Sequence, residues 1–70
     1  MAGIDVTKVE QHPNGRLLHS VRAQSTEGRM EFSIAVQDEG TVTQNEVAVF
    51  RSTLRFAKEL TESVRLRLGS

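Results

Sequence analysis

Residues 43–69 read TQNEVAVFRSTLRFAKELTESVRLRLG and form the longest regularly patterned stretch of this 70-residue sequence. Thr43 lies three residues before Glu46, the spacing of a capping box, in which each side chain hydrogen-bonds the backbone N–H of the other residue. No proline or glycine follows until Gly69, which can adopt the left-handed conformation that ends many helices. The stretch therefore predicts one helix over about residues 44–68, with a length of about 37 Å.

The apolar face of this helix is wide. Its apolar residues recur at spacings of three, four and seven and form two neighbouring stripes, which together cover about 160° of the helix circumference. A helix that packs on a single surface needs only about 100°. We therefore expect the helix to bury against the sheet of its own chain and against a second copy. The side chains expected in this homodimer interface are Phe50, Leu54, Phe56, Leu60, Val64 and Leu68.

The N-terminal half alternates between apolar and polar residues and contains two turn signals, at His12–Gly15 and at Thr26–Arg29. Alternation predicts a strand on each side of each turn, and such short turns predict antiparallel pairing. We expect a single α+β domain over residues 1–70. Its predicted order is βββα, a three-stranded antiparallel β-meander followed by one long C-terminal helix on one sheet face. The expected strands cover about residues 4–11, 16–25 and 29–37.

The second and third strands can be aligned from the sequence. A two-residue loop at Glu27-Gly28 would bring the apolar residues of both strands to the same face without further adjustment. The pairs expected directly opposite one another are Ala23 with Phe32, Val21 with Ile34, and His19 with Val36.

The first strand has an irregular alternation. Ile4 and Val6 are in phase with each other, whereas Val9 falls out of phase with both. An extra residue or a bend near Lys8 would explain this shift, and we expect a β-bulge there.

A chain of this size has a small core. Seventy residues bury only about 60% of the unfolded surface, and the sequence has no cysteine that could add a disulfide or a cysteine–metal bond. The predicted helix is also about 10 Å longer than an eight-residue strand, so Val64 and Leu68 would extend beyond a single sheet. We expect a homodimer for these reasons. The alternative is a helix that frays after about Glu62.

The charge distribution bears on the kind of partner. The formal net charge is zero, which argues against a strongly basic nucleic-acid binder. Residues 1–42 carry four basic and six acidic side chains, and residues 43–70 carry five basic and three acidic ones, so the halves differ in sign. No apolar run has the length of a membrane span, and Met1-Ala2-Gly3 does not begin a signal peptide. We expect no membrane partner and a cytoplasmic location.

The residues that carry catalytic chemistry are sparse. The two histidines are His12, in a turn, and His19, on the apolar face of a strand next to Ser20. Neighbours on a strand point to opposite faces, so this serine and histidine cannot form a nucleophile–base pair. Three or four converging ligands would be needed for a metal, and no glycine-rich phosphate loop is present. We expect no enzyme activity, no cofactor and no metal, with His19 acting as a packed core residue.

The most consistent function is a non-catalytic, homodimeric protein-interaction module. Either edge of the meander could also pair with a strand of another protein. An alternative is a nucleic-acid-associated regulatory protein that uses the basic edge of the helix, formed by Arg51, Arg55, Lys58 and Arg65. A third is an accessory subunit of a larger complex. No motif is specific enough to indicate a family or a biological process.

Overall fold

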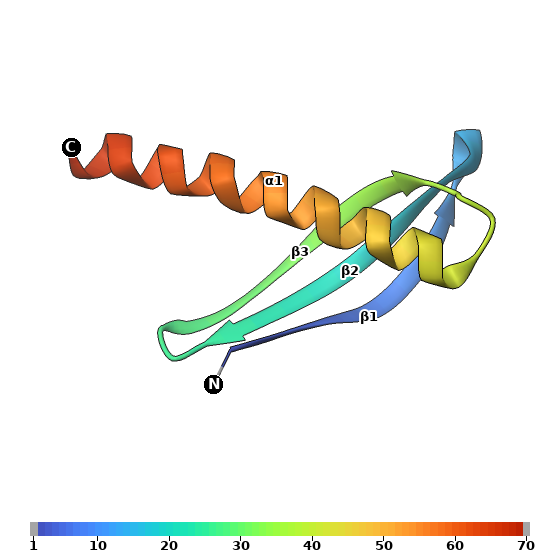
Figure 1. Cartoon of the computed structure of the whole chain (residues 1–70), viewed down its shortest axis with the longest axis horizontal. Coiled ribbons are helices and arrows are strands. Elements are labelled where there is room, and N and C mark those ends of the chain that lie inside the picture. The colour runs from blue at the N-terminus through green and yellow to red at the C-terminus, as the bar shows by residue number, and fades with distance from the viewer. Residues whose placement is uncertain (1, 70) are drawn as a thin grey trace.

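The computed structural model describes residues 2–69 and shows an open three-stranded sheet followed by one long helix (Figure 1). The strands pair antiparallel in the order β1-β2-β3. This confirms the predicted βββα arrangement, and the predicted bounds differ from the observed ones by at most two residues. The elements are β1 (Gly3–His12), β2 (Arg16–Ser25), β3 (Gly28–Gln37) and α1 (Val42–Leu68), with a short 3-10 turn, η1 (Pro13–Gly15), between β1 and β2.

A β-bulge in β1 explains the irregular alternation of that strand. The register of β1 against β2 shifts between Val6 and Lys8, which leaves Thr7 as the extra residue. The Thr7 hydroxyl donates a hydrogen bond to the carbonyl of Ser20 at 3.3 Å. Because one extra residue reverses the alternation, Val9 returns to the same face of the sheet as Val6. The expected irregularity near Lys8 is confirmed.

The predicted loop between β2 and β3 is wrong by one position. Ser25 pairs with Gly28, so the loop residues are Thr26 and Glu27, and the backbone N–H of Glu27 donates to the Ser25 hydroxyl at 3.1 Å. The partner of every β2 residue therefore moves by two positions. Since the side-chain period of a strand is two, each apolar residue keeps its face. The observed pairs include Leu17 with Val36, His19 with Ile34, Val21 with Phe32, and Ala23 with Met30.

The start of α1 also differs from the prediction. The N-cap is Thr41, whose hydroxyl accepts a hydrogen bond from the backbone N–H of Gln44 at 3.1 Å. The side chain of Gln44 lies 3.3 Å from the same hydroxyl. Thr41 and Gln44 have the same spacing as Thr43 and Glu46, two residues earlier, so the predicted capping residue was wrong. Half of the predicted capping box forms, because the Thr41 hydroxyl accepts from the Gln44 N–H, while the Gln44 side chain accepts from the Thr41 hydroxyl and not from its backbone N–H.

The end of α1 is as predicted. Gly69 adopts the left-handed conformation, with φ of 81°, and its N–H donates to the carbonyls of Arg65 and Leu66 at 3.1 and 3.2 Å. The helix continues through Glu62 to Leu68, in place of the alternative end near Glu62. Its 27 residues give it a length of about 40 Å.

The loop between β3 and α1 holds the start of the helix in place. The amide oxygen of Asn45 accepts from the backbone N–H of Glu39 at 2.7 Å, and its amide nitrogen donates to Asp38 at 3.2 Å. The same Asp38 carboxylate accepts from the N–H of Gly40 at 2.9 Å. This backbone hydrogen bond, together with the one from Asn45, lowers the pKa of Asp38 from its ordinary value. Asn45 is itself buried, so it links the loop to the core.

The core lies between the sheet and the first half of α1. Its buried apolar side chains are Val21, Val36 and Val49. Four further apolar residues pack around them, which makes the core small even for a chain of this length. These flanking residues are Val6, Phe32, Ile34 and Ala48.

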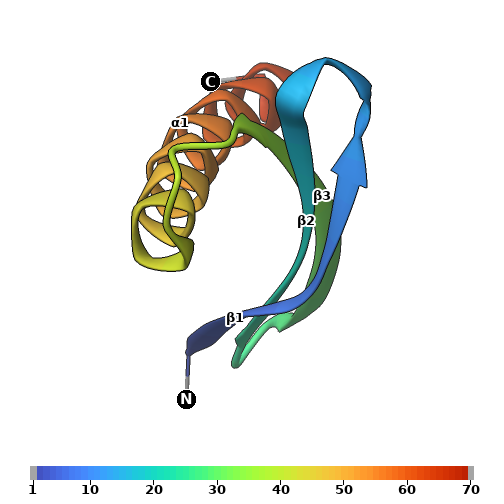
Figure 2. The same ribbon diagram turned by 90° about the vertical axis from the view of Figure 1, so that its right-hand side faces the viewer.

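The helix and the sheet diverge from one another. Figure 2 shows a curved sheet with α1 on its concave side, and Figure 1 shows the C-terminal end of α1 projecting away from the β2–β3 hairpin. The radius of gyration is 13.7 Å, against about 11 Å expected for a compact chain of this length. The molecule is therefore elongated, and one end of the sheet is left without a covering helix.

Candidate interaction surface

The distal half of α1, residues 54–68, lies outside the core. Every residue from Leu54 to Gly69 is exposed, whereas Val49 in the first half is completely buried. The distal half nevertheless carries six large apolar side chains, each between 38% and 78% exposed. They are Leu54, Phe56, Leu60, Val64, Leu66 and Leu68.

The residues predicted for a homodimer interface are all exposed in the single chain. The ring of Phe56 lies 5.5 Å from that of Phe32, centroid to centroid. Phe50 is 40% exposed and lies one turn before Leu54 on the same side of the helix. The prediction of an intersubunit role for these residues is not decided by the single chain, but the structure does leave their surface uncovered.

A second uncovered apolar area lies on the sheet. Ile4 pairs with Ala23, and Ala23 pairs with Met30, so these three residues form a row across the strands. Val21 lies two positions from Ala23 along β2, so it points to the same face, and it is buried. Ile4 and Met30 are 41% and 46% exposed because α1 does not extend over this end of the sheet. The sequence placed these residues on the apolar face but did not predict their exposure.

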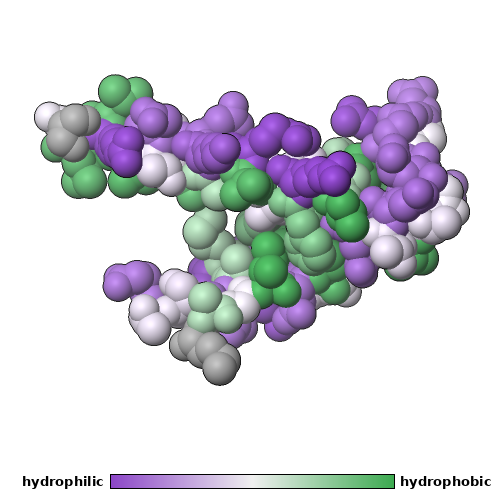
Figure 3. All heavy atoms as spheres, in the orientation of Figure 1, coloured by the Kyte–Doolittle hydropathy of each residue, from purple (hydrophilic) through white to green (hydrophobic). Residues whose placement is uncertain are grey.

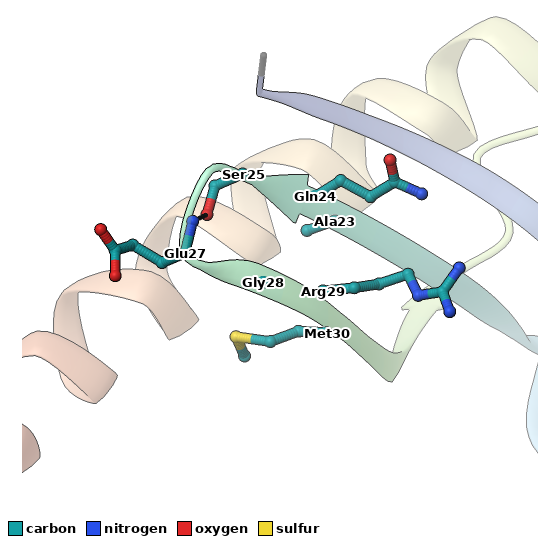
Figure 4. A pocket seen from close by; sticks show the side chains of 7 residues that line it. All are labelled: Ala23, Gln24, Ser25, Glu27, Gly28, Arg29 and Met30. Atoms are coloured by element: carbon teal, nitrogen blue, oxygen red, sulfur yellow. Dashed lines mark hydrogen bonds between the residues drawn. The ribbon is translucent and has the colours of Figure 1, made fainter.

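The hairpin beside this row is hollowed. A hollow of about 400 Å³ lies against the ends of β2 and β3, and we call it the hairpin hollow. Small residues leave the space beside Met30 open, while the side chains of Glu27 and Arg29 point in opposite directions (Figure 4). The residues that line it are Ala23, Gln24, Ser25, Glu27, Gly28, Arg29 and Met30.

The accessible surface area of the chain is larger than that of a compact monomer of the same mass. The accessible area is 5594 Å². A compact monomer of the same mass, 7.8 kDa, is expected to expose about 4,400 Å². The excess of about 1,200 Å² is larger than the roughly 800 Å² that each partner buries in a standard protein interface.

The four basic residues predicted as an alternative contact surface are exposed along one side of α1. Arg65 lies 3.6 Å from Glu62, and Arg55 donates to the hydroxyl of Ser52 at 2.9 Å. Arg51 and Arg55 also line a shallow hollow of about 310 Å³ together with Arg16, a residue that the sequence did not associate with them. Glu39 lines the same hollow, so its charge is mixed.

The two histidines lie in different environments. His19 is 2% exposed and occupies the core face of β2, while Ser20 pairs on the opposite face. His12 is exposed, 3.8 Å from Glu10, and Glu10 also bonds Lys8 at 2.7 Å. The contact with Lys8 lowers the pKa of Glu10. Within residues 2–69, no three His, Asp or Glu side chains converge as metal ligands would.

The free edges of the sheet are β1 and β3. The bulge at Thr7 twists one of them, and α1 runs beside part of the other. Pairing of an edge with a strand of another protein stays a prediction.

Comparison with known proteins adds no relative. No protein-family model, curated protein or solved structure matches this chain. The 27 residues of α1 are enough to cross a bilayer, but charged side chains interrupt them, and no helix within the described part of the chain is apolar enough to span a membrane. A functional proposal therefore depends on the geometry of the chain itself.

Proposed function

We propose that this chain is a non-catalytic, homodimeric protein-interaction module, and that the distal half of α1 forms most of the contact between copies. The observation that supports this most directly is a run of exposed residues, Leu54 to Gly69, that carries six large apolar side chains. Leu54, Phe56, Leu60, Val64 and Leu68 form one apolar stripe, whereas Leu66 lies on the charged side of the helix. Single apolar residues on a surface need no explanation, but an apolar stripe on a projecting helix is typical of an interaction site.

The size of the surface fits a stable partner. About 1,200 Å² of area beyond that of a compact monomer is available, and association must offset a cost of about 4–15 kcal/mol for lost freedom of motion. A standard interface of about 800 Å² per partner offsets this cost when its packing is good, because packing quality decides the affinity more than area does. The small core makes the same contact important for the stability of the fold.

The solution mass tests this proposal. Light scattering across a concentration series should give a dimer, and circular dichroism should show loss of helix as the dimer dissociates. Leu60→Gln should weaken the dimer by about tenfold or more, because it places a polar group on the apolar stripe. Lys58→Gln is the matched control on the charged side of α1 and should leave the dissociation constant nearly unchanged.

A wild-type chain that stays monomeric and fully folded at micromolar concentration would overturn the homodimer. The same exposed stripe would then be the binding site for a different protein, as in the predicted accessory-subunit role.

The alternative is nucleic-acid binding through Arg51, Arg55, Lys58 and Arg65. For either function the proposed location is the cytoplasm. Retention on heparin separates the two functions. A nucleic-acid binder should be retained with a steep salt dependence that falls in Arg51→Ala/Arg55→Ala. A dimer module should elute at low salt and behave the same in that variant.

A further inference from the structure

Two uncovered apolar surfaces border one opening in this molecule. On one side are Leu60 and Val64 of α1, and on the other are Ile4 and Met30 of the sheet. Figure 3 shows the molecule hollowed between the distal half of α1 and the β2–β3 hairpin, with apolar side chains on both sides. We call this opening the groove. The two apolar surfaces border the same opening, but the side chains of both stay exposed.

The uncovered row on the sheet is wide enough to pack against one helix. The row of Ile4, Ala23 and Met30 crosses three strands, and neighbouring strands lie about 4.8 Å apart, so the row is about 10 Å wide. This width is close to the diameter of one α-helix with its side chains, about 10–12 Å. The distal half of α1 is about 22 Å long, enough to cross the whole row.

Charge favours a helix on the sheet over a helix on a helix. The distal half of α1 carries four basic and two acidic side chains, a net charge of +2, so pairing two such segments brings like charges together. The part of the chain that contains the sheet, residues 1–42, carries four basic and six acidic side chains, a net charge of −2, and opposite signs favour its contact with the helix. The charged row of Asp5, Arg22 and Glu31 lies on the opposite face of the sheet from Ile4, Ala23 and Met30, so the groove face itself offers apolar side chains.

We infer, on the basis of the proposed homodimer, that the groove of each copy receives the distal half of α1 from the other copy. In such a two-fold pair each chain supplies one helix and one groove, so the dimer contains two equivalent contacts between helix and groove. Both uncovered apolar surfaces of each chain are then buried. The row of Ile4, Ala23 and Met30 then completes its packing on side chains of the partner. The partner's helix extends the small core of Val21, Val36 and Val49 along the sheet.

Disulfide cross-linking between single-cysteine variants tests this arrangement. The native sequence has no cysteine, so each introduced thiol can react only with another introduced thiol. Met30→Cys and Val64→Cys are prepared separately, mixed, allowed to exchange subunits and oxidised. Both native side chains are nearly half exposed, so neither substitution should prevent folding, which circular dichroism checks. Because each chain has one cysteine, every cross-link is between copies.

The expected product is a mixed dimer that links position 30 of one chain to position 64 of the other. It should form about tenfold or more faster than the product of Met30→Cys with Lys58→Cys, whose thiol lies on the charged side of α1. Dimers linked only through position 64 of both chains would show helix against helix; they would overturn the inference but leave the proposed homodimer intact. A chain that light scattering shows to be monomeric would overturn both.

Discussion

The rings of Phe32 and Phe56 lie 5.5 Å apart, centroid to centroid, with their planes inclined by 33°. This contact joins β3 to the middle of α1, and every residue after Phe56 up to Gly69 is exposed. The aromatic pair therefore stands at the boundary between the packed half of the helix and the distal half.

The aromatic pair should contribute measurably to stability. A double-mutant cycle with Phe32→Leu and Phe56→Leu is expected to give a coupling free energy of about 0.5–1.5 kcal/mol, the range for aromatic pairs. Urea unfolding followed by circular dichroism at one protein concentration measures it. The cycle of Phe32→Leu with Leu66→Ala is the control, since Leu66 is 78% exposed, and its coupling should be close to zero. Equal couplings in the two cycles would contradict the observed packing.

The observed helix cap makes a prediction that separates two neighbouring threonines. Thr41→Ala should lower the free energy of unfolding by about 1 kcal/mol, because the N–H of Gln44 loses its acceptor. Thr43→Ala lies inside the first turn and should change it by less than about 0.5 kcal/mol. Urea unfolding of the two variants decides between them, and the reverse order would favour a helix that begins at Thr43.

The buried histidine should be a cost to the fold. His19 is 2% exposed, and its Nδ1 atom has no hydrogen-bond partner among the described residues. An unsatisfied buried polar atom costs about 1–3 kcal/mol. We therefore expect His19→Leu to raise the free energy of unfolding by about 1 kcal/mol, measured by urea unfolding at neutral pH. His12→Leu, in the exposed turn, serves as control and should have little effect; a destabilised His19→Leu would mean that the imidazole has a partner.

Acid should loosen the start of α1. The pKa of Asp38 is lowered in the folded chain by the hydrogen bonds from Gly40 and Asn45. A carboxyl group with a lower pKa when folded stabilises the fold above its unfolded pKa, and this contribution is lost as pH falls through the folded value. Stability should thus fall in acid less steeply in Asp38→Asn than in the wild type or in Glu39→Gln. Urea unfolding from pH 6 down to about pH 2 measures the difference, and identical curves for all three chains would exclude this role.

The sequence predicted which face of the sheet each side chain occupies better than it predicted the pairs of residues that lie opposite one another. Alternation with a period of two placed Val21 and Phe32 on the apolar face, and this survived an error of two positions in the register. The N-cap was misplaced because Thr41–Gln44 and Thr43–Glu46 satisfy the same spacing. The loop decided between them, since Asn45 bonds Asp38 and Glu39 and so sets where the helix begins.

The candidate surface was only partly predictable. The wide apolar face of α1 indicated the exposed side chains, including Leu60 and Val64, because helical periodicity is a local property. The exposure of Met30 and the hairpin hollow depend on the angle at which α1 crosses the sheet. That angle follows from how Val49 and Phe56 pack on the strands, and no period in the sequence encodes it.

Because Asn45 holds one end of α1 and the other end projects from the fold, a rotation at Asn45 would displace the far end of the helix most. Asn45 is fixed to the β3–α1 loop, and Leu68 lies 23 residues further along α1, a distance of about 35 Å. A rotation of about 10° at the anchor would move Leu68 by about 6 Å, which is more than one helical turn of rise. Small changes in the loop, such as loss of the Asp38 hydrogen bond, are thereby amplified at the far tip. The packing of Val49 and Phe56 on the sheet opposes such a rotation, so these contacts and the loop together determine how wide the groove opens.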